Sequence, residues 1–336
     1  MHVHAGNNKK MLNMLILEIL RDCTDAEHHL TQQEIIDLLR LNYSMECDRR
    51  SIRNNIQSLK DMGYDIITSR GCYLAEREFD DAELRMLIDS VLFSRSLSGA
   101  QARRLIEKLE RFGNRYFRAK VSHVSNLPEL FHSDNKQVML ALDVLNDAIE
   151  EKRKVSFVYN SYGTDFKLHP KREEPYIVNP YQMVANNGRY YLIGNYDKYD
   201  NVSHYRIDRI TSVEMLSEPV KPKKEIKEFA RGWTLPKHMA EHIYMFSGES
   251  VTVKLITETY MMDDLIDWFG RDFSIIEKGD GKMEVTLKCN ENAMKYWALQ
   301  FGDNVEILSP KNMRDSIAES VRGMYALYCE EKGEQK

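Results

Sequence analysis

Two short stretches in the middle of the chain, Asn187–Gly194 and His204–Ile210, constrain its fold more than any other feature. In both, apolar and polar residues alternate, which is the pattern of a β-strand with one buried face. The strand of the first stretch follows an Asn-Asn-Gly turn at Asn186–Gly188. In the second, the alternation places His204, Arg206 and Asp208 on one face of the strand. An ordinary sheet surface rarely carries charge at this density, so we expect a functional polar face here.

The two stretches closely resemble the signature of the WYL family of bacterial regulators. Tyr190 stands where the name-giving tryptophan is usual, and Pro180-Tyr181 and the run from Tyr205 to Ile210 fit the same pattern. The resemblance implies a small Sm-like or SH3-like β-barrel that binds a ligand, with anionic molecules as the first candidates. It does not identify the ligand.

Cationic and aromatic side chains of this region are the candidate ligand contacts. Arginine binds phosphate and carboxylate groups through paired hydrogen bonds, and aromatic rings can stack on bases. Arg206 is our first choice, because the alternation puts it beside His204. Structural roles stay open: Asp208 and Arg209 can pair at a sheet edge, and Tyr190 or Tyr191 can belong to the core. The predicted contacts are Tyr159, Tyr181, Arg189, Tyr191, His204, Arg206 and Arg209.

The first eighty residues have the pattern of three helices. Apolar positions between Met11 and Arg21 share one helical face, a capping box opens a second helix at Thr31, and Asp48 can cap a third. The last two helices are joined by a brief connection, which predicts a helix-turn-helix. The hairpin expected over residues 64–74 looks like a wing.

The third helix begins with residue types that suit DNA. With Ile52 and Ile56 buried, its arginines and amides face solvent and can reach phosphates or base edges in a major groove. An Arg-rich first turn can also be a solvated surface, and residues 1–75 hold nine Lys and Arg against ten Asp and Glu. The arrangement favours DNA, because the carboxylates crowd the first two helices while the arginines gather on the third. The predicted contacts are Arg49, Arg50, Ser51, Arg53, Asn54, Gln57 and Arg70.

This third helix also resembles the recognition helix of the winged regulators that accompany WYL domains. It departs from them at Asn54-Asn55, where that pattern usually has Arg-Asp. We therefore carry over no base preference.

The rest of the chain alternates between helical and strand patterns. Helices are expected over Asp80–Arg95 and Ser98–Phe112, an irregular connection over Gly113–Asn135, and a further helix over Gln137–Lys152. From Ser250 onward the expected order is βαββαβα, which indicates a ferredoxin-like module. This region is similar to the C-terminal extension often found after WYL domains.

The sequence thus predicts an α+β multidomain protein with four parts. They are a winged helix-turn-helix DNA-binding domain (1–78), a helical connector (79–135), a WYL ligand-sensing barrel (136–218) and a ferredoxin-like C-terminal module (219–332).

Composition excludes some classes of protein. A net charge of −5 argues against general polyanion coating, so a nucleic-acid contact must rest on a local patch. No apolar run approaches the length of a membrane span, and we expect no membrane partner. The five cysteines are scattered, which suits reduced thiols in a cytoplasm.

No catalytic arrangement is evident in the sequence. There is no Gly-rich phosphate loop after a strand and no nucleophile elbow. His238 and His242 have a spacing that can bind metal, but no third ligand is evident, and we expect exposed histidines before a strand. The sequence predicts no metal site, no cofactor and no enzymatic activity.

These observations combine into one hypothesis and one alternative. The hypothesis is a cytoplasmic, homodimeric, ligand-responsive transcriptional regulator that binds an inverted repeat in double-stranded DNA, with a nucleotide or nucleic-acid fragment as its anionic effector. The alternative is a module that binds single-stranded nucleic acid or RNA through the WYL barrel. The sequence does not fix the effector, the DNA target, the direction of regulation or the dimer interface.

Overall fold

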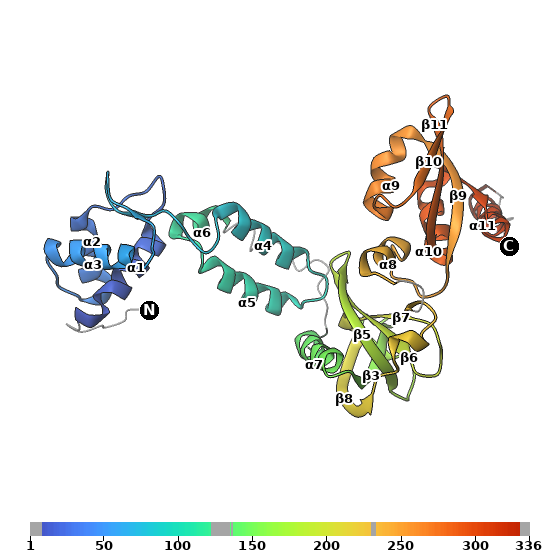
Figure 1. Ribbon diagram of the computed structural model, residues 1–336, viewed down its shortest axis with the longest axis horizontal. Coiled ribbons are helices and arrows are strands. Elements are labelled where there is room, and N and C mark those ends of the chain that lie inside the picture. The colour runs from blue at the N-terminus through green and yellow to red at the C-terminus, as the bar shows by residue number, and fades with distance from the viewer. Residues whose placement is uncertain (1–8, 122–134, 136, 230–232, 330–336) are drawn as a thin grey trace, which may run out of the picture. The chain divides into compact units, whose positions relative to one another are not determined.

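A computed structural model describes residues 9–121, 135, 137–229 and 233–329 of the chain. The chain divides into two compact units, residues 1–134 and residues 135–336. Helices and strands are mixed in both units (Figure 1). Short 3-10 turns lie at Lys9–Met11, Ile207–Arg209, Lys223–Glu225, Thr259–Met261 and Gly302–Asn304.

The first unit opens with three helices and a small hairpin. They are α1 (Leu12–Cys23), α2 (Gln32–Tyr43) and α3 (Arg49–Asp61), followed by the antiparallel strands β1 (Ile66–Ile67) and β2 (Tyr73–Leu74). The capping box expected at Thr31 is present, with Glu34 returning a hydrogen bond to the Thr31 backbone amide. The Asp48 carboxylate accepts from the Ser51 amide and so fixes the start of α3.

Thr24, at the end of α1, ties these helices to the hairpin and to the helices that follow. Its buried hydroxyl donates to the Leu20 carbonyl at 2.5 Å and accepts from the Leu74 amide at 3.2 Å. Its carbonyl accepts from Arg77 at 2.5 Å and from Asn114 at 3.1 Å. One residue thereby satisfies polar groups from four segments of the unit.

Three further helices complete the first unit: α4 (Asp81–Phe93), α5 (Gly99–Glu110) and α6 (Arg115–Val121). Capping boxes at Asp80 and Ser98 start α4 and α5 as the sequence indicated. The expectation that Gly113–Asn135 is irregular is wrong at its beginning. The Asn114 side chain accepts from the Phe117 amide at 2.7 Å, and Phe117 is buried, so a short helix forms there. Residues 122–134 lie outside the described residues.

The second unit begins with α7 (Val138–Glu150) and a curled antiparallel sheet. Its strands are β3 (Arg153–Tyr162), β4 (Leu168–Pro170), β5 (Tyr176–Asn186), β6 (Arg189–Tyr196), β7 (Ser203–Arg206) and β8 (Ile210–Pro219). The order is β4-β3-β5-β6-β7, with β8 paired to β3. Among the described residues β7 and β8 are not paired to each other, so the expected barrel is an open, half-closed sheet.

Both faces of this sheet are covered. On one face, α7 packs its buried side chains, Val138, Ala141, Leu145 and Ala148, against a core that includes Phe157, Leu192 and Tyr205. On the other face, the segment around α8 (Leu235–Glu241) contributes Trp233, Leu235 and Met239 to a second core that includes Ile193 and Val202. The curled sheet is therefore a middle layer and not an open surface.

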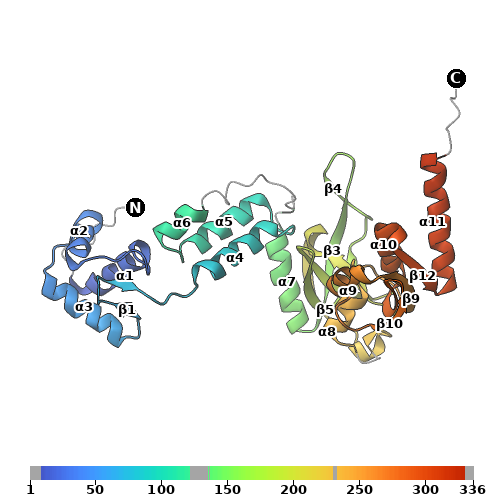
Figure 2. The same cartoon turned by 90° about the horizontal axis from the view of Figure 1, so that it is seen from above.

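A second, four-stranded sheet ends the chain. The elements are β9 (Ser250–Glu258), α9 (Met262–Phe269), β10 (Ser274–Gly279), β11 (Lys282–Asn290), α10 (Glu291–Phe301), β12 (Val305–Ser309) and α11 (Lys311–Cys329). The order βαββαβα is the one expected from the sequence. The strands lie in the order β10-β11-β9-β12, and every neighbouring pair is antiparallel. Trp297 of α10 is fully buried against this sheet, whereas α11 projects away from it (Figure 2).

Candidate functional site

The exposed side of α3 presents the cations and amides that the sequence predicted. Ile52, Ile56 and Leu59 are buried, which turns the opposite side of the helix to solvent. The Arg49 guanidinium donates to the Gln33 side chain at 3.2 Å, and the Gln57 amide donates to Asp61 at 2.8 Å. Exposed on this side are Arg49, Arg50, Arg53, Asn54 and Gln57, with Ser51 half-buried and Arg70 exposed at the hairpin tip.

In the second unit, the pairing of β6 with β7 brings four of the predicted ligand contacts onto one face, namely Arg189, Tyr191, His204 and Arg206. Tyr191 lies opposite Arg206, and Ile193 lies opposite His204. Because alternate residues of a strand share a face, Arg189 and Tyr191 lie on the same face as Arg206. The intervening Leu192 and Tyr205 point into the core under α7.

The guanidinium of Arg206 is held by the carboxylate of Asp208. Nε donates to Oδ1 at 3.1 Å and Nη2 donates to Oδ2 at 2.6 Å, while the Arg206 amide donates to the Tyr159 hydroxyl at 3.1 Å. Burial alone would lower the pKa of Arg206, but its hydrogen bonds to Asp208 and the charge of that carboxylate raise it. The arginine therefore stays protonated, and its Nη1 makes no hydrogen bond with any described residue.

The expected strand from His204 to Ile210 is wrong beyond Arg206. The chain turns into a 3-10 helix at Ile207–Arg209 before β8 begins. Asp208 is consequently buried, with only 3% of its side chain exposed, and pairs with Arg206 and not with Arg209. Arg209 is half-buried, and its Nε is buried without a hydrogen-bond partner among the described residues.

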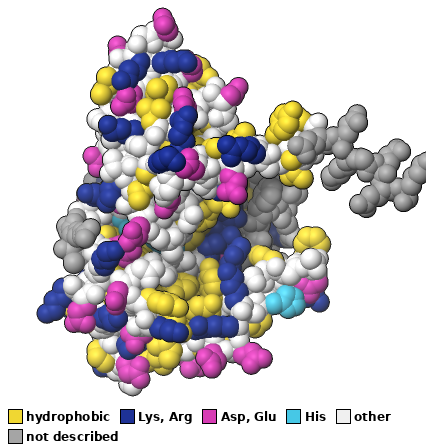
Figure 3. Space-filling model, turned by 90° about the vertical axis from the view of Figure 1, so that its right-hand side faces the viewer, with side chains coloured by type: hydrophobic (Ala, Val, Ile, Leu, Met, Phe, Trp, Pro, Cys, Tyr) yellow, Lys and Arg dark blue, Asp and Glu magenta, His cyan; other side chains and the backbone are white. Residues whose placement is uncertain are grey.

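One face of the second unit is hollowed between its two sheets. Lys and Arg side chains gather in and beside this hollow, next to apolar ones (Figure 3). Cations beside apolar surface suit the recognition of an organic anion.

Two protein-family models match the chain. The WYL domain matches residues 141–215, which contain Arg206, Asp208 and the paired strands β6 and β7. The WCX domain matches residues 248–325, which form the four-stranded sheet and its helices. The chain therefore contains a WYL domain and a WCX domain.

Known proteins show similarity over most of its length. A curated relative, the uncharacterized HTH-type transcriptional regulator YobV of Bacillus subtilis (strain 168), is 21% identical over 300 residues, which cover 84% of this chain and 90% of YobV.

Two solved structures are more distant. Proteasome accessory factor B/C (PafBC) of Arthrobacter aurescens is 16% identical with a TM-score of 0.30. The match covers 98% of this chain and 50% of the PafBC chain. A CRISPR Cas-related protein is 16% identical with a TM-score of 0.39, covering 75% of each chain.

Within the WYL domain, two of the other predicted contacts, Tyr181 and Tyr159, have structural roles. The Tyr181 ring is buried against Phe229, and its hydroxyl donates to the Lys221 carbonyl at 2.7 Å. Tyr159 packs edge-on against Phe157 and Tyr205, and burial raises the pKa of its hydroxyl. These two tyrosines support the sheet, whereas Arg189, Tyr191, Arg206 and Arg209 are half-buried.

His204 lies under α8, in contact with two further histidines. Its Nε2 is 2.8 Å from Nε2 of His238, and the ring centroids of His238 and His242 are 4.3 Å apart. The expectation that His238 and His242 are exposed is wrong, since each is 5% exposed. The reason is that α8 folds back over the WYL sheet, which a one-dimensional pattern does not reveal.

These histidines do not converge on a metal position. The Nε2 atoms of His204 and His238 face each other, and Nδ1 of His242 lies 2.9 Å from the Phe246 carbonyl oxygen. Throughout the described residues, no group of three or more His, Cys, Asp or Glu side chains is arranged to hold a metal ion. In that same part of the chain, no helix is both long and apolar enough to cross a membrane.

None of the residues around α8 was among the predicted site residues. The composition after residue 218 indicated a domain boundary, although Trp233 and a helix start at Leu235-Pro236 lie in that segment. A proline in the first turn of a helix is a recognised start signal. Together, this proline and two histidines four residues apart, which share one face of a helix, are the signal in the sequence for α8 and for its packed side.

Proposed function

We propose that this chain is a ligand-responsive transcriptional regulator of the WYL type, acting on double-stranded DNA in the cytoplasm, and not an enzyme. The observation that carries the proposal is the exposed side of α3, where arginines and amides follow a helix start fixed by Asp48. The WYL and WCX domains support it, as does the similarity to YobV, which is named an HTH-type transcriptional regulator.

In this proposal, residues 1–78 form a winged helix-turn-helix. The recognition helix is α3, and β1 and β2 form the wing with Arg70 at its tip. The connector (79–135) leads to the WYL sensor (136–218) and then to a ferredoxin-like module (219–332), whose strand order β10-β11-β9-β12 is that of a split βαβ fold. A recognition helix in the major groove would place the predicted side chains near base edges and phosphates.

The proposed effector is an organic anion, a nucleotide or a nucleic-acid fragment, bound at the Arg206 cluster. Arg206 offers its free Nη1, and Arg189, Tyr191 and Arg209 lie on or beside the same face. Guanidinium groups are well suited to phosphate and carboxylate. A ligand bound here would regulate DNA binding only if it prefers one of two conformations of the protein.

A homodimer is the proposed assembly, and α11 supports it. Beyond its buried Met313, the exposed helix continues an apolar stripe through Val321, Met324 and Tyr328. Residues 317, 321, 324 and 328 are spaced symmetrically about a point between 322 and 323, so an antiparallel second copy would meet the same stripe. Val321→Glu with Met324→Glu should then yield monomers in sedimentation, whereas Arg322→Glu, on the opposite side, should not.

Footprinting on the DNA that flanks the protein's own gene tests the proposed function. We expect a protected inverted repeat that disappears when Arg49, Arg50 and Arg53 are all changed to alanine. Changing Arg40 and Arg104, exposed arginines of α2 and α5, is the matched control and should leave protection intact. Repeating the assay with nucleotides and short oligonucleotides identifies the effector by a change in protection.

The same variants separate this proposal from its alternative. If duplex binding survives the triple substitution, and Arg189→Gln with Arg209→Gln removes binding of single-stranded nucleic acid, then the WYL sheet is the nucleic-acid surface and the regulator proposal is wrong. Glutamine keeps much of the length of arginine and removes its charge, so these variants test charge and not packing.

A further inference from the structure

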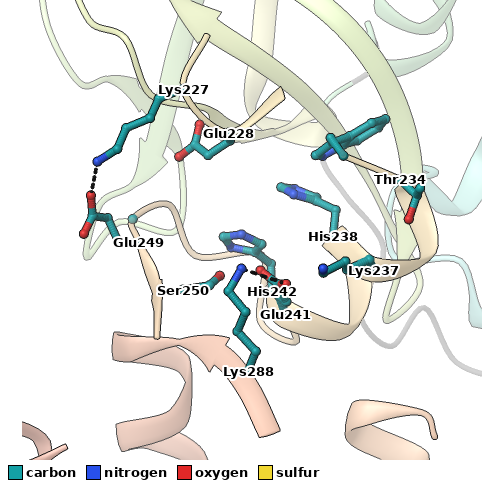
Figure 4. A pocket seen from close by; sticks show the side chains of 12 residues that line it. Lys227, Glu228, Thr234, Lys237, His238, Glu241, His242, Glu249, Ser250 and Lys288 are labelled. Carbon is teal, nitrogen blue, oxygen red and sulfur yellow. Dashed lines mark hydrogen bonds and ion pairs between the residues drawn. The ribbon is translucent and has the colours of Figure 1, made fainter. Parts of the chain in front are cut away.

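A separate cavity of about 240 Å³ lies beside α8 (Figure 4). Its walls come from the connection after β8, from α8 itself, and from β9 and β11 of the WCX domain. Neither Arg206 nor any other predicted effector contact lines it. Its volume suits a ligand of a few heavy atoms, since drug-sized molecules occupy larger pockets.

Six charged side chains line this cavity, and four of them neutralise one another. The Lys227 ammonium is 2.6 Å from a Glu249 carboxylate oxygen, and the Lys288 ammonium is 3.1 Å from one of Glu241. The remaining two are Lys237 and Glu228, neither of which forms an ion pair within the described residues. The walls therefore offer one ammonium and one carboxylate that a ligand can use.

Glu228 is oriented by the backbone of the WYL sheet. One of its carboxylate oxygens accepts from the Val202 amide at 2.5 Å. Burial raises the pKa of this carboxyl group above its ordinary value. A half-buried carboxylate with an unused oxygen is a good receptor for a cationic group, because the cation offsets the cost of its burial.

Two neutral hydrogen-bonding groups in the walls also lack a partner. The indole Nε1 of Trp233 and the hydroxyl of Ser250 are buried, and neither hydrogen-bonds to any described residue. Buried polar groups are rarely left unpaired in proteins, so such groups at a cavity wall point to a ligand or to water. The indole can only donate, which matches an oxygen acceptor on the ligand.

We propose that this cavity binds a small zwitterion of the α-amino-acid class. The carboxylate of the ligand is held by Lys237 and by the Trp233 and Ser250 donors, and its ammonium group is held by Glu228. A simple anion would leave Glu228 as a repelling charge, and a simple cation would leave Lys237 and the indole unused. Only a molecule with both charges uses every free group.

The cavity also touches the WYL sheet through His238, which lines it and contacts His204 on β7. His204 is two residues from Arg206 on the same face. The cavity would bind a second ligand class at a second site, whether or not the Arg206 cluster binds an effector.

The test uses the whole 336-residue chain and the twenty standard amino acids, added one at a time. Isothermal titration and tryptophan fluorescence report binding, and Trp233 should respond because it lines the cavity. We expect at least one amino acid to bind saturably. Glu228→Gln and Lys237→Met should each weaken that binding by roughly tenfold or more, and Trp233→Phe by less, as expected for charged and neutral hydrogen bonds respectively.

Matched controls are Glu225→Gln and Lys224→Met, exposed neighbours that do not line the cavity and should leave affinity unchanged. Propionate and propylamine, which carry one charge each, should bind at least tenfold more weakly than the amino acid. Because Lys237 is exposed on α8, we expect Lys237→Met to stay folded. Its affinity for the amino acid therefore tests the proposal even if Glu228→Gln unfolds. The proposal is overturned if no amino acid binds, if single-charge analogues bind equally well, or if Lys237→Met binds like the natural protein.

Discussion

Nε2 of His204 on β7 lies 2.8 Å from Nε2 of His238 on α8, which is hydrogen-bond distance. Burial, with the neighbouring His242, lowers the pKa of His238 to about 3, and burial also lowers the pKa values of His204 and His242. The three rings are therefore neutral at pH 7. Because a neutral imidazole has one N–H, one ring of the pair donates and the other accepts.

This pairing predicts that the WYL–α8 packing weakens in acid. The folded-state pKa values lie below the unfolded value of about 6.5, so the unfolded state binds more protons once the pH falls below 6.5. The contribution of these histidines to the free energy of unfolding is therefore fully present above about pH 7. It is lost as the pH falls, by up to about 1.4 kcal/mol per pH unit for each histidine. Hydrogen exchange of α8 and β7 between pH 8 and pH 5 measures the loss. His169→Gln, on the exposed β4 hairpin, should leave the profile unchanged, whereas His238→Gln should flatten it.

The Arg206–Asp208 pair predicts a coupled effect on stability. Arg206→Ala leaves the buried Asp208 carboxylate without its cation, and we expect a loss of about 3–5 kcal/mol. Asp208→Ala should cost less, because 20% of the Arg206 side chain reaches solvent. The double variant should be more stable than the sum of the two losses predicts, by about 1–3 kcal/mol. Hydrogen exchange of β6 and β7 amides gives the three values, and strict additivity would show that the pair is not coupled.

If the exposed face of α3 contacts DNA, substituting one of its arginines should change how duplex binding depends on salt concentration. If Arg53 contacts a phosphate, Arg53→Ala should weaken duplex binding uniformly across sequences and reduce the slope of log K against log salt concentration by about 1. Fluorescence anisotropy at several salt concentrations measures the slope. Arg40→Ala on α2 is the control. An equal change of slope in that variant would mean that the loss of any one positive charge, and not its place on α3, explains the effect.

Replacing Thr24 by a side chain of the same shape should lower the stability of the first unit. Thr24→Val keeps the volume of the side chain but leaves the Leu74 amide without its acceptor, at a cost of about 1–3 kcal/mol. Thr68→Val, at an exposed position of the hairpin, should change stability by less than about 0.5 kcal/mol. Urea unfolding of the two variants makes the comparison, and equal stabilities would contradict the structural role given to Thr24.

Much of the fold follows from local patterns. The capping boxes at Thr31, Asp80 and Ser98 mark helix starts through contacts three residues apart, so the sequence alone contains the signal. The alternation around Tyr191 likewise predicts β6 and its buried side. These predictions succeed because the interactions that decide the structure are close in sequence.

The errors arise where distant segments meet. Alternation predicts that Asp208 lies on a strand surface, but it lies in a turn whose Asp208 and Ile210 carbonyls accept hydrogen bonds from the distant Asn135 side chain. The local sequence predicts that His238 is exposed, whereas the packing of α8 on β6 and β7 buries it. Because the cavity beside α8 is built from segments before and after that helix, its lining could not be assembled from spacing alone.

The local bond between Arg206 and Asp208 has a consequence for recognition. Since the partner is only two residues away, the guanidinium is immobilised by its own loop and does not tether distant parts of the sheet. A flexible arginine loses rotational freedom when it grips a ligand, and this one has lost most of it during folding. Nη1 is in consequence a preorganised donor, ready to bind an incoming acceptor with little further ordering of the side chain.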